Sequence, residues 1–115
     1  MADPDKTLFQ KIADGEVPAD VVYQDDRAVA FRDINAQAPT HVLVVPRKPI
    51  PRADAVEEAD EALVGHLFTV ARRVAEAERL SDYRLVVNNG AGAGQTVFHL
   101  HVHLLGGRAL QWPPG

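Results

Sequence analysis

The sequence predicts an α+β fold in which five short strands form an antiparallel sheet beside one long and one short helix. Three observations lead to this prediction. The chain has 115 residues, a common size for one domain, so a single domain is expected over residues 1–115. Apolar residues recur with helix periodicity in two segments and with strand character in five short ones. Tight turns join strands as hairpins, and the strand–helix alternation of a parallel sheet is missing.

Local signals define each expected element. Thr7 is a typical N-cap for a short helix over residues 7–14, which Gly15 ends. The strands are expected at residues 21–24, 28–32, 41–45, 83–88 and 99–105. The long helix is expected at about residues 56–79, with acidic residues at its start. Its apolar stripe comprises Leu63, Leu67, Val70 and Val74, widened by Phe68, Ala71 and Ala75.

Composition argues against several classes of function. The chain has 12 Lys and Arg against 16 Asp and Glu, a net charge of −4, so a basic face for nucleic acid or an anionic membrane is not expected. The absence of cysteine excludes disulfides, iron–sulfur clusters and cysteine zinc sites. No apolar run is long enough to cross a bilayer, and no signal-type apolar core follows the charged residues 1–6. We therefore expect a cytoplasmic protein.

One segment, residues 85–107, has the character of a site. It contains no Asp, Glu, Lys or Arg, where average usage predicts about five or six. On a strand, side chains alternate, so His99, His101 and His103 are expected on one face and the intervening apolar residues on the other. A single strand histidine is usually structural, and His66 on the long helix is interpreted that way. Three histidines in register indicate a functional site.

Two interpretations of the three histidines compete, a chelated metal and a histidine nucleophile. The preceding residues 90–94 contain three glycines, whose backbone N–H groups suit a phosphate rather than a cation. Gln95 and Thr96 add an amide and a hydroxyl, and no carboxylate lies nearby in the sequence to complete a metal shell. No Lys follows the glycines, so the loop is not a Walker A motif. The segment therefore predicts phosphate chemistry without a metal.

Residues 99–105, His-Leu-His-Val-His-Leu-Leu, match a family signature at all seven places. This segment resembles the histidine triad (HIT) family of nucleotide hydrolases and transferases. Residues 31–34, 38–41, 83–88, 94–97 and the tail 106–115 resemble the Hint branch, whose members are purine nucleoside phosphoramidases. His103 stands where the transferases have Gln, which favours hydrolysis. Thr96 stands where the family usually has Ser, which keeps the hydroxyl group and adds a methyl group.

The resemblance implies a role for each matching residue. His101 would attack the α-phosphorus of a purine nucleoside 5′-phosphoramidate or an acyl- or aminoacyl-adenylate, and water would hydrolyse the nucleotidyl-histidine to a monophosphate such as AMP. His103 would bind the phosphate, His99 would orient the nucleophile, and His41 would join the same relay. Asp33, otherwise typical of a strand-ending turn, would bind the ribose hydroxyls. The remaining implied contacts are Phe9, Ile12, Phe31 and Ile34 around the purine, and Asn88, Gly94, Gln95, Thr96 and Val97 near the phosphate and leaving group. No cofactor and no metal are implied.

The resemblance also implies a homodimer whose two sheets join, since pairing across a two-fold axis would cover sheet edges. Trp112, in the Pro-rich tail, would then pack at the interface near the partner's site. Three alternative functions stay open at this point. They are hydrolysis of dinucleoside polyphosphates, nucleotide binding or scaffolding with little turnover, and metal binding by the histidines.

Overall fold

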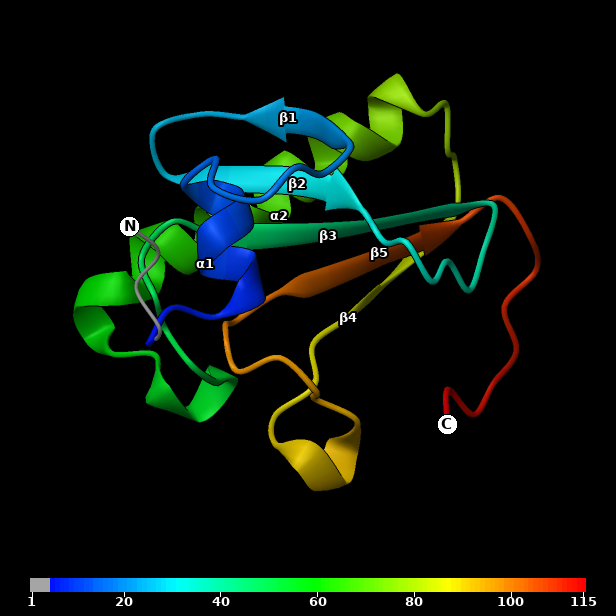
Figure 1. Ribbon diagram of the computed structural model, residues 1–115. Helices are drawn as coiled ribbons and strands as arrows, with labels where there is room; N and C mark the ends of the chain where they lie inside the picture. Colours follow the sequence, from blue (N-terminus) through cyan, green and yellow to red (C-terminus); the bar gives the residue numbers. More distant parts are fainter. Residues whose placement is uncertain (1–4) are drawn as a thin grey trace.

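The computed structural model describes residues 5–115, so the first four residues of the charged start lie outside it. Five strands form one antiparallel sheet in the order β1-β2-β3-β5-β4, which confirms the predicted α+β class (Figure 1). The strands are β1 Val21–Gln24, β2 Ala28–Arg32, β3 Thr40–Pro46, β4 Tyr83–Val86 and β5 Val102–Gly106. Within residues 5–115, no helix is both long and apolar enough to span a membrane.

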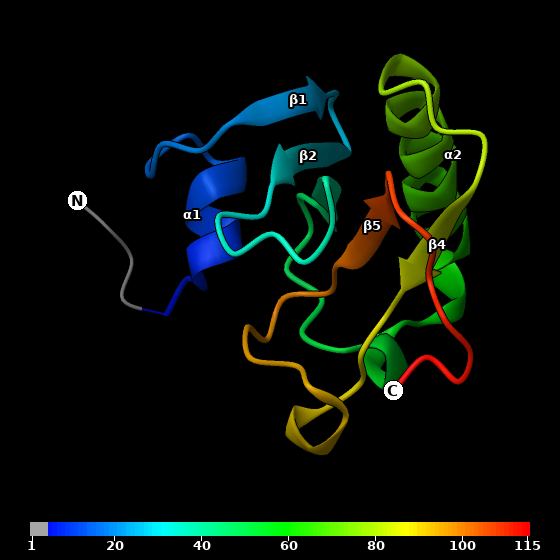
Figure 2. The same ribbon diagram turned by 90° about the vertical axis from the view of Figure 1, so that its right-hand side faces the viewer.

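The sheet lies between two helices, α1 Leu8–Ala13 on one face and α2 Glu61–Ala77 on the other (Figure 2). Thr7 is the N-cap of α1, as predicted, and its hydroxyl accepts the N–H of Gln10. The two-residue alternation of the strands sorts the core into two clusters. On β3, Val42 and Val44 pack toward α2, whereas Leu43 and Val45 pack toward α1. Because α1 has only six residues, it covers part of its sheet face and leaves the rest open.

The long helix is shorter than the sequence predicts. It spans Glu61–Ala77 rather than 56–79, and two 3-10 turns, Ala53–Ala55 and Glu58–Asp60, precede it. The acidic residues expected to start the helix instead build a capping box, in which the side chain of Asp60 accepts the N–H of Glu57. Lys48 donates to Asp60 at 2.6 Å and ties this turn to the segment after β3. Phe68 was expected to widen the apolar stripe, and that expectation is wrong because Phe68 is exposed.

The strand that carries the histidines begins later than predicted. It spans Val102–Gly106 rather than 99–105, so His99 and His101 precede it and only His103 lies within it. Antiparallel pairing of Val44 with Val102 would place Leu100 opposite Pro46, and proline has no N–H for the ladder. The N–H of Leu100 donates instead to the Ile50 carbonyl at 2.6 Å. The predicted alternation still holds, since Leu100, Val102 and Leu104 all join the α2 side of the core.

The remaining strand bounds shift by smaller amounts. Strand β3 is one residue longer at each end than 41–45, and β4 ends at Val86 rather than Asn88. The segments predicted at 21–24 and 28–32 are confirmed as the β1–β2 hairpin.

Gly107, directly after β5, is expected to tolerate no side chain. It has a φ of +92°, and a Cβ there would lie 2.9 Å from the Cβ of Pro39. Replacement by alanine adds a left-handed backbone strain to this clash, so Gly107→Ala should lower the free energy of unfolding by about 1–3 kcal/mol. Gly92→Ala is the control, because nothing lies within 4 Å of its Cβ position, and it should change stability by less than about 0.5 kcal/mol. Urea denaturation measures both, and equal losses would contradict the prediction.

Candidate active site

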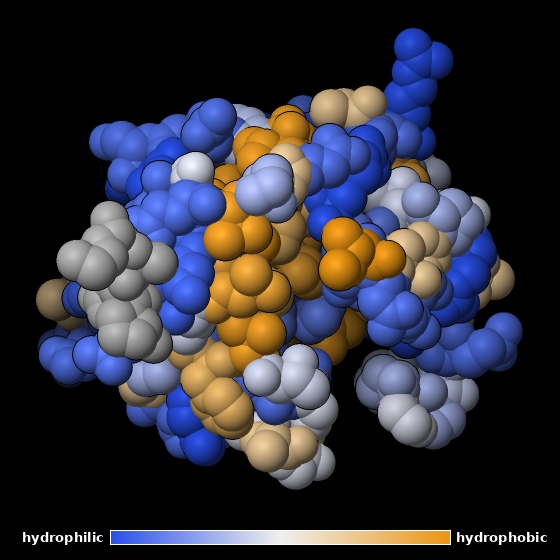
Figure 3. Space-filling view, in the orientation of Figure 1, coloured by the Kyte–Doolittle hydropathy of each residue, from blue (hydrophilic) through white to orange (hydrophobic). Residues whose placement is uncertain are grey.

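A cavity of about 380 Å³ opens on the α1 face of the sheet. Hydrophobic side chains form a band in the middle of this face (Figure 3). His101, His103 and Thr96 all lie in the wall of the cavity. Its other predicted lining residues are Phe9, Ile12, Phe31, Asp33, Ile34 and Val97. The structure therefore gathers side chains from α1, β2, β5 and the loop before β5 around one hollow.

One hydrogen bond and one ring contact fix the orientation of His101. Its Nδ1 lies 2.7 Å from the main-chain carbonyl of His99, and a carbonyl only accepts, so Nδ1 carries the proton of the neutral ring. Nε2 therefore keeps its lone pair. The ring of Phe9 packs edge-on against His101, with centroids 4.9 Å apart, and holds the ring from the α1 side.

His99 is fully buried beneath His101 and anchors that carbonyl. Its Nε2 donates to the carbonyl of Pro46 at 2.7 Å, which leaves Nδ1 to accept from the hydroxyl of Thr7 at 3.4 Å. The same hydroxyl caps α1. The N-cap of the short helix and the end of β3 therefore both hold the residue whose carbonyl orients His101.

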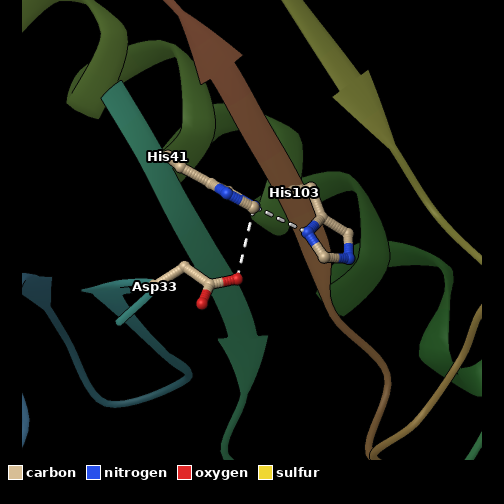
Figure 4. A group of neighbouring side chains, drawn as sticks. All are labelled: Asp33, His41 and His103. Carbon is tan, nitrogen blue, oxygen red and sulfur yellow. Dashed lines mark hydrogen bonds and ion pairs between the residues drawn. The ribbon is translucent and has the colours of Figure 1, made fainter. Parts of the chain in front are cut away.

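His41 and His103 form a second pair on neighbouring strands (Figure 4). Nε2 of His41 lies 2.9 Å from Nδ1 of His103 and 3.4 Å from a carboxylate oxygen of Asp33, which follows β2. Asp33 also accepts the N–H of Asn35, so it forms the turn that its type indicates. On its other side, Nδ1 of His41 accepts the main-chain N–H of Gln37 at 3.0 Å.

Burial favours the neutral form of all four histidines. It lowers the pKa of His41, against the opposing charge of Asp33, and it lowers the pKa of His99 and of His101, against the carbonyls that accept their protons. Burial, then the neighbouring His101 and His41, lower the pKa of His103 to about 4. The site thus contains neutral rings at physiological pH, each with one donor and one acceptor nitrogen.

Asp33, His41 and His103 bring three potential metal ligands within 4.8 Å of one another. The carboxylate that the local sequence lacks therefore comes from a distant segment. Metal-ligating histidines usually donate their other ring N–H to an acceptor. Nδ1 of His41 instead faces the N–H of Gln37, so ligation through Nε2 would leave a neutral ring with no nitrogen free to hold its proton. This donor set does not suit a metal ion.

Residues 90–94, the glycine-rich loop, are not among the residues that line this cavity, and their role toward a phosphate stays a prediction. Several N–H groups of this segment bond within the loop, because those of Ala93 and Gln95 donate to the Gly90 carbonyl and that of Gly94 donates to the Ala91 carbonyl. The buried side chain of Gln95 accepts the N–H of Gly90 and donates to the carbonyls of Pro51 and Val97. The side chain of Gln95 therefore organises the loop.

Asn88 and Gly94 also lie outside the cavity wall and adjoin each other, since a Cβ at Gly94 would lie 3.6 Å from Nδ2 of Asn88. Trp112 is 82% exposed and is likewise not part of the wall. Sequence reasoning missed several residues that do contribute. Leu43 lines the cavity, and its position two residues after His41 on one strand was the available signal. Gln37 and Pro46 act through main-chain atoms, which no side-chain pattern reveals.

Arg32 is a charged residue in the cavity wall for which the sequence indicated no role. Its guanidinium pairs with Glu78 at 2.5 Å and with Asp20 at 3.4 Å. Both pairs balance its positive charge. The chemistry available around His101 therefore comes mainly from neutral imidazoles, the Thr96 hydroxyl and the Asp33 carboxylate.

Comparison with known proteins assigns the chain to a family. A model of the HIT domain matches residues 14–110. An uncharacterized HIT-like protein of Synechocystis sp. is 54% identical over 110 residues, which cover 95% of this chain and 96% of that protein. A HIT family hydrolase from Legionella pneumophila Philadelphia 1 is 50% identical, with a TM-score of 0.93 over 96% of this chain and 100% of the other. A histidine triad protein from Clostridium difficile is 38% identical, with a TM-score of 0.90 over 96% and 97% of the two chains.

The fold and the clustered histidines are thus those of a HIT hydrolase-like protein. With a family model covering most of its length and a relative more than half identical, this chain belongs to the HIT family.

The depressed pKa of His103 should make stability depend on pH. Folded His103 stays neutral down to about pH 4, whereas in the unfolded chain it takes up a proton near pH 6.5. The unfolded state binds more protons in that window, so the free energy of unfolding falls as the pH drops from 6.5 toward 4, and this group has no effect above 6.5. Urea denaturation at pH 7.5 and 5.0 should show a larger loss for wild type than for His103→Gln. Equal losses in the two proteins would contradict the assignment.

Proposed function

We propose that this protein hydrolyses purine nucleoside 5′-phosphoramidates and acyl- or aminoacyl-adenylates, as in the Hint branch of the HIT family. One observation carries the proposal. The lone pair of His101 Nε2 is free in a cavity wall because Nδ1 is held by the carbonyl of His99. A neutral, oriented imidazole of depressed pKa is a suitable nucleophile at neutral pH.

The reaction proceeds in two displacements at the α-phosphorus. Nε2 of His101 attacks, the P–N bond breaks, and the nitrogen leaves as a neutral amine after taking up one proton from solvent. Water then attacks the phosphorus, the bond to His101 breaks, and one proton returns to solvent with release of the nucleoside monophosphate. Nδ1 of His103 accepts from His41, so its Nε2–H is available to donate to a phosphoryl oxygen.

The lining of the cavity supports a purine nucleotide as the ligand. Phe9, Ile12, Phe31 and Ile34 offer apolar surface for a base, and Asp33 retains acceptor capacity for ribose hydroxyls. The Thr96 hydroxyl and His103 supply hydrogen bonds for the phosphate. The volume of about 380 Å³ lies within the range of about 300–1,000 Å³ that is usual for small-molecule sites. Asn88, Gly94 and Gln95 contribute by shaping the loop that presents Thr96 and Val97.

Loss of the nucleophile should abolish turnover. His101→Ala should lower kcat on adenosine 5′-phosphoramidate by about 10⁴-fold or more, because no other group forms the covalent intermediate. The matched control is His66→Gln. His66 lies on α2, on the other face of the sheet, pairs with Asp25 and is not part of the cavity wall, so the activity of this variant should stay within about twofold of wild type. AMP release is measured by chromatography with a metal chelator present.

The same assay with a dinucleoside tetraphosphate separates the alternatives. Cleavage of the tetraphosphate alone would move this protein to another hydrolase branch of the family. Tight AMP binding without turnover of either substrate would indicate a nucleotide-binding protein. Loss of phosphoramidase activity on chelation would contradict the metal-free mechanism.

We also propose that two copies form a homodimer with joined sheets. Strand β4 is at one edge of the sheet, and Tyr83 on it and Trp112 in the tail are both exposed. An exposed tryptophan followed by two prolines suits an interface, in which the tail lies near the partner's cavity. Light scattering at micromolar concentration should give about twice the mass of the 12.5 kDa chain. A monomeric mass would overturn this proposal.

A further inference from the structure

The hydrogen bond between the Gln37 main chain and His41 determines which way the histidine pair is polarised. A backbone N–H can only donate, so Nδ1 of His41, 3.0 Å away, is held without a proton. The proton of the neutral ring is therefore on Nε2, which faces Nδ1 of His103 at 2.9 Å and Asp33 at 3.4 Å. Each group in the series donates to the next, from Gln37 through His41 to His103.

The same bond resists the addition of a second proton to His41. Asp33 is the negative charge that faces this ring, and by itself it would favour an imidazolium. His103, the titratable group facing it from β5, is neutral at physiological pH. A proton on Nδ1 would point at the N–H of Gln37, so the imidazolium is disfavoured as long as that N–H stays in place.

The tail after β5 holds the Gln37 main chain. Nη2 and Nε of Arg108 donate to the Gln37 carbonyl at 2.9 and 3.2 Å, and its Nη1 donates to Ala109 at 3.0 Å. Gly107 lies against Pro39 so closely that a Cβ would be 2.9 Å away. The tail directly after β5 therefore contacts the loop before β3 at two points, and both segments lie together in the ribbon diagram (Figure 1).

We propose that Arg108 is a positioning residue, which fixes the Gln37 main chain so that His41 stays neutral, protonated on Nε2 and a donor to His103. It touches none of the residues in the cavity wall through its guanidinium bonds, all of which go to main-chain carbonyls. The last consequence, that His103 is left as a donor to a phosphoryl group, depends on the proposed function. The state of His41 does not depend on it.

The test is the protonation state of the histidine rings, observed by long-range ¹H–¹⁵N NMR of the full chain without ligand. In wild type at pH 8, Nδ1 of His41 should have the shift of an unprotonated nitrogen. Arg108→Met keeps the aliphatic stem and loses the donors. It should raise the titration midpoint of His41 by at least about half a pH unit, because Asp33 is then less opposed.

Two controls separate this effect from general loosening. Arg84→Met removes another arginine that donates to a tail carbonyl, that of Gln111, and should leave the His41 midpoint unchanged. Gln37→Ala removes only the side-chain bond to the Asn35 carbonyl and keeps the main-chain N–H, so the His41 ring should be unaffected. An unchanged midpoint in a folded Arg108→Met protein, or an equal change in Arg84→Met, would overturn the proposal.

Kinetics give a second readout. The ratio of wild-type to Arg108→Met kcat on the phosphoramidate should grow by about twofold or more from pH 8 to pH 6, as His41 becomes protonated in the variant. KM should change little. If wild type does not cleave the phosphoramidate but the NMR shift is seen, the proposed function fails and the role of Arg108 stands. If wild type cleaves the phosphoramidate but Arg108→Met leaves the His41 midpoint unchanged, the proposed function stands and the role of Arg108 fails.

Discussion

The missing N–H of Pro46 is the constraint on which the site depends. Pro46 is the last residue of β3, and the partner strand β5 does not begin until Val102 because the ladder cannot be extended opposite it. Residues 99–101 are therefore released from sheet pairing. The Pro46 carbonyl accepts a hydrogen bond from Nε2 of His99, and the carbonyl of His99 accepts one from Nδ1 of His101. In a regular strand those main-chain carbonyls would be directed at the neighbouring strand instead.

The alternation of side chains was the most predictive feature of the sequence. It placed the apolar residues between the histidines toward α2, and this is where Leu100, Val102 and Leu104 pack. The bounds of the strand were less predictable, because they depend on a proline that is more than 50 residues away in the sequence. Asp33 and His41 flank the β2–β3 connection, and the pairing of these two strands brings the carboxylate to the ring. Main-chain partners such as the Gln37 N–H leave no trace in residue patterns.

The glycine-rich loop illustrates a different limit of the sequence. Its composition indicates close backbone approach, and the positive φ of Gly90 and Gly94 agrees with that. Part of this close approach is internal, because the N–H of Gly90 donates to the side chain of Gln95. Hydrogen-bonding capacity can be counted in a sequence, but whether it is already satisfied internally is a property of the folded chain. Around the cavity, main-chain groups and neighbouring rings hold the histidines in defined tautomers. Hydrogen bonding to a phosphate can therefore come from neutral rings, without a lysine or an unpaired arginine nearby.

Helix α1 brings Thr7 to His99 and Phe9 to His101, and with Ile12 it walls the cavity. A helix of six residues is far below the length that is stable alone in water, about 12–15 residues. Its persistence comes from docking of Phe9, Ile12 and Ala13 on the sheet. Undocking would remove the cavity wall and the support of His99 together while the sheet and α2 stay folded. The fraction of molecules with an intact cavity is thus set by a local opening equilibrium of α1, which is separate from the global stability of the protein.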